Sequence, residues 1–112
     1  MFDSLLGRNR VDPDVLFALK WKKPSEIKVF IQKSDLGYFA KVTNIEGNLV
    51  TQAKGGMELV EMVNEAVYDF LDIPVQYRAE LGFFMPPEDV REEFQLAIPK
   101  KYLGKEIGLA TA

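Results

Sequence analysis

The chain has 112 residues, of which 47% are hydrophobic and 28% charged, and it contains neither cysteine nor histidine. This length and composition are typical of one folded domain, so we expect a single domain over residues 1-112. Without cysteine or histidine, the chain can form no disulfide, thiolate nucleophile, imidazole base or Cys/His zinc site.

Charge is distributed unevenly along the chain. Residues 1-54 carry nine Lys/Arg and six Asp/Glu, whereas residues 55-112 carry five and eleven, within a net charge of -3. The acidic half argues against a protein that coats nucleic acid, and we expect no DNA binding. No apolar run approaches the roughly 20 residues that cross a bilayer, so we expect no membrane segment and a cytoplasmic location.

The first 25 residues form an N-terminal extension that contains a short helix. Asp12 followed by Pro13 predicts the start of this helix, because Asp accepts hydrogen bonds from the first N–H groups and Pro fits the first turn. We expect the helix to continue to about Lys20, and its buried side would consist of Val15, Leu16 and Leu19.

Apolar and polar residues then alternate in three short segments, which predicts three strands. These segments cover residues 26-33, 38-43 and 49-54, and turn-forming residues separate them. Because the connections are short, we expect an antiparallel meander.

The most regular helical pattern runs from Met57 to Asp72 and ends before Pro74. Six apolar residues share one side of this helix and are expected to cover the sheet: Leu59, Met62, Val63, Ala66, Val67 and Phe70. Residues 75-85 could form a fourth strand or a turn, and residues 86-97 a second helix.

Together these elements predict an α+β fold. It has a three- or four-stranded antiparallel meander with one main helix packed on one face, which is a β-β-β-α core with short flanking helices. We expect the flanking segments to cover the opposite face of the sheet.

Three short motifs within this core resemble those of the HicB-like family. They are Gly37-Tyr38-Phe39-Ala40 at the second strand, Thr51-Gln52 at the third, and Glu65-Ala66-Val67 in the helix. The likeness covers roughly residues 27-74, so residues 26-74 are interpreted as a HicB-like core and residues 75-112 as a C-terminal extension. Ala53-Lys54-Gly55 replaces the family's Gly-Asp-Thr, which removes the usual side-chain cap of the helix.

The resemblance implies a partial ribonuclease H fold and a regulatory role. Many HicB-like proteins are antitoxins that bind and block a small basic RNA-cleaving toxin, and many carry a separate DNA-binding segment. Residues 75-112 lack a pattern that would read DNA. The resemblance therefore implies a small basic toxin-like protein as the partner.

Five acidic residues step by three or four along the predicted main helix, and we call them the acidic ridge. At about 100° per residue they lie within an arc of about 80°. Such a ridge is either a solvated outer face or a contact surface for a basic protein partner. Its members are Glu58, Glu61, Glu65, Asp69 and Asp72.

The sheet face opposite the helix carries Phe30, Phe39 and Val50 among lysines. We expect the N-terminal helix with Trp21, the segment 83-85, or a second copy of the chain to cover it. The alternative is stacking of RNA bases on the aromatic rings. The basic run of residues 20-23, which includes Trp21, is either a solvated edge or a contact with an acidic surface.

Catalysis is not expected. Ribonuclease H chemistry needs several carboxylates that converge on two Mg²⁺ ions, and the strands carry only Glu26. The sequence thus predicts no catalytic residue, no metal site and no cofactor. It favours a noncatalytic regulatory protein that binds a protein partner and forms a homodimer or larger oligomer. The alternatives are an orphan oligomeric structural domain and a sheet-based RNA-binding protein.

Overall fold

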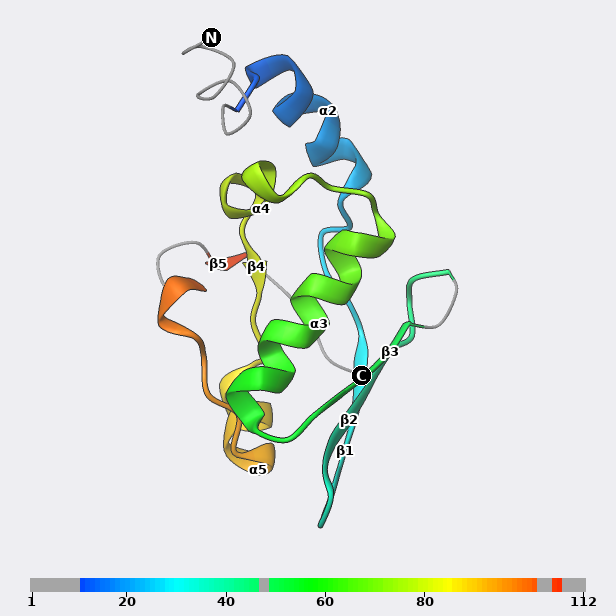
Figure 1. Cartoon of the computed structure of the whole chain (residues 1–112), viewed down its shortest axis with the longest axis vertical. Coiled ribbons are helices and arrows are strands. Elements are labelled where there is room, and N and C mark those ends of the chain that lie inside the picture. The colour runs from blue at the N-terminus through cyan, green and yellow to red at the C-terminus, as the bar shows by residue number, and fades with distance from the viewer. Residues whose placement is uncertain (1–10, 47–48, 103–105, 108–112) are drawn as a thin grey trace, which may run out of the picture.

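The computed structural model describes residues 11–46, 49–102 and 106–107, and it has an α+β architecture (Figure 1). Three strands and one long helix form the centre, and shorter elements flank them. In chain order the elements are α2 (Pro13–Lys22), β1 (Val29–Ser34), β2 (Gly37–Val42), β3 (Leu49–Ala53), α3 (Gly56–Phe70), α4 (Val75–Leu81), β4 (Phe83–Phe84), α5 (Glu88–Phe94), the 3-10 helix η1 (Lys100–Tyr102) and β5 (Glu106–Ile107).

The three central strands form an antiparallel sheet in the order β1-β2-β3, as predicted. Gly37 begins β2 with a φ of +129°, and a Cβ atom there would lie 2.6 Å from the carbonyl oxygen of Ala53. Only glycine fits this position, because the backbone of the neighbouring strand comes too close for a side chain. The inner face of the sheet buries alternate residues, among them Val29, Tyr38, Ala40, Val42 and Ala53.

Helix α3 packs across this inner face and makes most of its contacts with β2 and β3 (Figure 1). The buried side of α3 differs in part from the prediction: Met62 and Phe70 are 38% and 44% exposed, whereas Val60, Asn64 and Tyr68 are buried. The helix is therefore turned so that it covers the sheet on one side and the segment 82–84 on the other.

Two buried side chains of α3 explain this rotation. The Asn64 amide hydrogen-bonds both to the N–H and to the carbonyl of Phe84, and the Tyr68 hydroxyl donates to the carbonyl of Gly82. Buried backbone groups need such partners, because an unsatisfied one costs about 1–3 kcal/mol. The polar side chains thus hold β4 against α3.

Residues 75-85 do not form a fourth strand of the main sheet, and they are not a simple turn. They form helix α4, and then β4, whose partner is β5 in a separate parallel pair. The segment is too short to show helical periodicity, and Val75, Tyr77 and Phe84 are residues that favour strands.

The predicted second helix is shorter than expected. Helix α5 ends at Phe94, because Gln95 adopts a left-handed conformation with a φ of +57°, rather than continuing to residue 97. The hydrophobic core of the sheet also includes buried side chains that follow α3 in the chain. Among them are Tyr77, Leu81, Phe84, Leu96 and Tyr102.

Helix α2 lies at one end of the molecule, beside α4 (Figure 1). It buries no residue completely: Leu16 and Leu19 pack partly against the core, whereas Val15 is exposed. The Asp12 N–H donates to the Tyr77 hydroxyl at 3.0 Å, which fixes the start of the helix on α4.

Candidate functional site

The acidic ridge lies along the side of α3 that faces away from the core. Glu58, Glu65, Asp69 and Asp72 are exposed and Glu61 is half-buried. Three of the five carboxylates have partners within the chain, and two of these partners are cations, so the ridge is less uniformly negative than its sequence indicates.

Glu58 has a structural role that the sequence pattern did not reveal. Its carboxylate accepts a hydrogen bond from the Lys54 N–H at 2.9 Å, just before the helix begins at Gly56. Gly55 occupies the N-cap position without a side-chain cap. Glu58 therefore ties the residue before the N-cap to the first turn of α3, but it does not replace the missing side-chain cap, which would accept from the N–H groups of the helix itself.

Glu61 forms an ion pair with Lys101 of η1. The hydrogen bond to Glu61 raises the pKa of Lys101, and the negative charges of Glu61 and Glu65 add to the effect. The next residue, Tyr102, is buried with its ring stacked on Phe83 at 4.0 Å between ring centroids, and this fixes the backbone beside Lys101.

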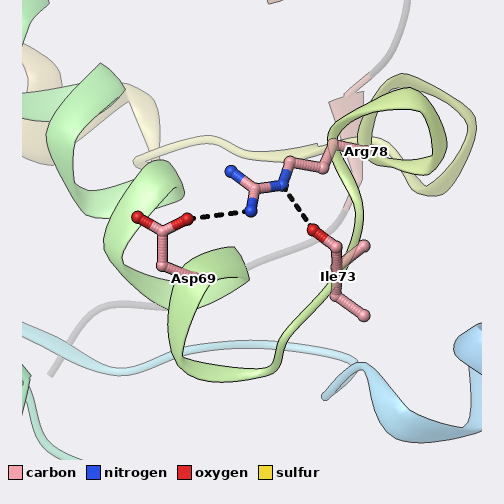
Figure 2. A network of polar contacts seen from close by, with 3 residues as sticks. All are labelled: Asp69, Ile73 and Arg78. Atoms are coloured by element: carbon pink, nitrogen blue, oxygen red, sulfur yellow. Dashed lines mark hydrogen bonds and ion pairs between the residues drawn. The ribbon is translucent and has the colours of Figure 1, made fainter.

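Asp69 is paired with Arg78 of α4, as Figure 2 shows. One guanidinium nitrogen of Arg78 lies 2.8 Å from the Asp69 carboxylate, and Nε donates to the carbonyl of Ile73 at 2.9 Å. The same guanidinium lies over the Tyr68 ring, 5.7 Å from its centroid. Arg78 thus connects the end of α3 to the turn that follows it.

Both ion pairs are open to solvent, since the Asp69 side chain is 72% exposed and that of Lys101 is 60% exposed. Exposed pairs of this kind contribute about 0–1 kcal/mol, so a charged partner can displace them. Glu65 and Asp72 have no ion-pair partner among the residues that the structure describes.

An apolar row runs directly beside the acidic ridge. It consists of Met62, Ala66 and Phe70, which follow one another at intervals of four residues and therefore stack along one side of the helix. The prediction placed these residues in the core. Because apolar residues cover more of the α3 circumference than one packed face needs, the sequence did carry a signal for this second apolar row.

The outer face of the sheet is open in the part of the chain that the structure describes. Phe30 and Val50 are each 51% exposed and lie opposite Lys41 on the central strand, whereas Phe39 is half-buried. The expected cover by the flanking segments is therefore wrong for residues 11–46 and 49–102. Phe84 packs instead on the inner side, against α3, and Trp21 lies on α2.

The basic run of α2 divides into two parts. Lys20 and Lys22 are exposed, whereas Lys23 lies with its ammonium 5.7 Å from the centroid of the Phe84 ring, where burial lowers its pKa. Trp21 is 79% exposed and makes an edge-to-face contact with Phe17 at 6.2 Å.

An apolar cavity of about 30 Å³ lies in the core between the sheet, α3 and the segment 84–96. It has room for a single water-sized molecule, so it is a packing feature of the core. Among residues 11–46, 49–102 and 106–107, no group of acidic side chains is arranged to hold a metal ion. No helix in these same ranges is long and apolar enough to span a membrane.

Comparisons of the chain with protein-family models, with curated proteins and with solved structures return no match.

Proposed function

We propose that this protein is a noncatalytic regulatory protein of the HicB-like, antitoxin-like kind, which acts by binding a small basic protein. The order of strands and helix supports this proposal, because a three-stranded meander followed by one packed helix is the core that the family resemblance implies. We place the protein in the cytoplasm, with which its lack of cysteine is compatible.

One observation carries the binding role: α3 exposes apolar and acidic side chains next to each other. Met62 and Phe70 are 38% and 44% exposed, and Met62 lies one turn away from both Glu58 and Glu65 of the ridge. Apolar contacts at the centre of an interface provide affinity, while charges at its rim orient the partner and speed the encounter. This combination fits a basic protein that also presents apolar side chains.

The test uses the product of a neighbouring gene, if that gene encodes a basic protein of about 60–80 residues. The purified chain and this product are mixed, and the association rate is measured at low salt. Reversal of two ridge charges, Glu61→Lys with Glu65→Lys, should slow association at least about tenfold. The matched control, Glu92→Lys with Glu93→Lys on α5, makes the same change in net charge away from the ridge.

An equal association rate for the two double variants would contradict the ridge as the binding surface. If no neighbouring basic protein binds at all, the antitoxin-like role is wrong. The second candidate, an orphan oligomeric structural domain, would then be favoured, because α2 also exposes apolar side chains, Phe17 and Trp21.

A further inference from the structure

Helix α2 has two apolar sides rather than one. Leu16 and Leu19 face the core, while Phe17 and Trp21 lie on the opposite side of the helix and are 64% and 79% exposed. The short helix therefore attaches to its own chain with one side and presents a second apolar side to solvent. Exposed apolar side chains that lie in contact with each other are typical of interaction sites.

Lysines border this outward side of α2. At about 100° per residue, Lys20 and Lys22 fall on opposite flanks of the Trp21 position, and both are exposed. The outward side thus carries an aromatic pair with two lysines near the end of the helix, and the exposed Asp14 lies on the same side one turn before Phe17. Its complement is an apolar strip with negative charges beside it.

The outward side of α3 supplies that complement within the same sequence. Met62 and Phe70 are eight residues apart, about 12 Å along the helix, with the small Ala66 between them. The ring centroids of Phe17 and Trp21 are 6.2 Å apart, so the aromatic pair fits within this length. The ridge carboxylates run along one edge of the strip, where they would meet the lysine on the flank that faces them.

We propose that α2 of one copy docks on the outward side of α3 of a second copy. Reciprocal docking, in which α2 of each copy lies on α3 of the other, makes two equivalent contacts and closes a dimer with twofold symmetry. Contact with the described part of the chain, residues 11–46, 49–102 and 106–107, does not explain the surfaces, because Phe17 and Trp21 remain exposed while Leu16 and Leu19 pack on the core.

The outer face of the sheet is a less suitable site for self-association. Its exposed Phe30 and Val50 lie around Lys41, with Lys28 and Lys54 on the same face. Two identical copies of this face would bring lysines toward lysines, and like charges in an interface oppose binding. The α2–α3 contact brings unlike charges together.

The dimer would also regulate the proposed function, and this part of the inference rests on that function. The docked α2 occupies the acidic and apolar surface of α3 that the basic partner needs. Self-association and partner binding would then exclude each other, so a high concentration of the protein would hold its own binding surface closed.

The experiment measures the mass of the purified full chain by sedimentation, over a range of concentrations at low salt. One variant carries Lys20→Glu with Lys22→Glu, and a second carries Glu61→Lys with Glu65→Lys. Each variant alone should dissociate at least about tenfold more readily than the original chain. An equimolar mixture should regain the original affinity, because both contacts of the mixed dimer then join opposite charges.

Trp21→Ala should also weaken the dimer, and at concentrations where both proteins are monomeric its urea midpoint should match that of the original chain, because Trp21 is exposed. The control Phe30→Thr with Val50→Thr should leave the dimer intact. The inference is overturned if the original chain is monomeric up to about 1 mM, if the mixture of charge variants fails to associate, or if the sheet variant alone abolishes the dimer.

These results are independent of the basic partner, since self-association is measured on the protein alone. Trp21→Ala can thus be tested in both assays. If this variant loses the dimer and binds the neighbouring gene product as tightly as the original chain or more tightly, both the dimer and the partner binding are supported. If the two charge variants regain their affinity on mixing but the neighbouring gene product does not bind, the dimer is supported and the proposed partner binding is contradicted.

Discussion

The side chain of Asn64 pairs with the backbone of Phe84 as a neighbouring strand would. The Phe84 N–H donates to Asn64 Oδ1 at 2.7 Å, and Asn64 Nδ2 donates to the Phe84 carbonyl at 2.9 Å. Nδ2 also donates to the carbonyl of Val60 at 2.9 Å within the helix. A single buried amide thereby joins α3 to β4 and satisfies backbone groups that no strand reaches from this side.

Replacement of Asn64 with leucine should therefore destabilise the fold. Asn64→Leu keeps the branched outline of the side chain but leaves the N–H and the carbonyl of Phe84 without partners, at a cost of about 1–3 kcal/mol for each group. We expect the free energy of unfolding, measured by urea denaturation, to fall by about 2–5 kcal/mol. The exposed neighbour provides the control: Glu65→Gln should change stability by less than about 0.5 kcal/mol. Similar stabilities for the two variants would contradict the pairing.

Two adjacent glycines before and within α3 should respond differently to alanine. A Cβ atom on Gly56 would lie 2.4 Å from the carbonyl oxygen of Gln95, whereas one on Gly55 would meet nothing within 4 Å. Alanine normally favours a helix over glycine by about 1 kcal/mol, but the contact with Gln95 reverses this preference at residue 56.

We expect Gly56→Ala to lower the thermal midpoint more than Gly55→Ala does. The two variants should differ in free energy of unfolding by about 1–3 kcal/mol. Calorimetry of the two variants under identical conditions measures this difference. A more stable Gly56→Ala protein would show that the start of α3 does not lie against the segment after α5.

Elements with a regular local pattern could be predicted from the sequence. Elements whose structure depends on contacts with distant residues could not. The three strands and the main helix follow from alternation and helical periodicity, and the structure confirms them. The predicted orientation of α3 was partly wrong, because a helical wheel counts Asn64 and Tyr68 as polar residues and places them on the exposed side. Their burial depends on the backbone of residues 82–84, which lies beside them only after folding.

The candidate surfaces show the same division. The regular spacing of the ridge carboxylates was visible in the sequence, but their pairing with Lys101 and Arg78 was not, since both bases come from segments far along the chain. The outward apolar row of α3 was assigned to the core because apolar residues on two sides of a helix look like one wide face.

Tyr68 should give the fold a specific sensitivity to alkaline pH. Burial raises the pKa of Tyr68 to about 12, although the charge of Arg78 opposes this. The folded protein holds the phenol proton more tightly than the unfolded chain, in which the pKa is about 10. This contribution to stability is complete below pH about 10 and is lost as the pH rises toward about 12.

Tyr68→Phe removes this titration and also leaves the Gly82 carbonyl without its donor. At neutral pH we expect the variant to be less stable by about 1–3 kcal/mol. The stability advantage of the original chain should shrink between about pH 10 and about pH 12, because Tyr68 titrates over this range and is only the smallest of the causes that raise the pKa of Tyr102. Urea denaturation across this range measures the difference, and a constant advantage would contradict the burial of the phenol.

The orientation of α3 underlies every functional statement above, and the absence of cysteine from the sequence allows it to be measured directly. Met62→Cys and Val67→Cys each introduce a single thiol, whose rate of modification is measured in dilute native protein. Met62 is 38% exposed and Val67 is fully buried. We predict that the thiol at residue 62 reacts at least about 100-fold faster than the thiol at residue 67, which must wait for local or global unfolding. Equal rates, or faster modification at residue 67, would contradict the account.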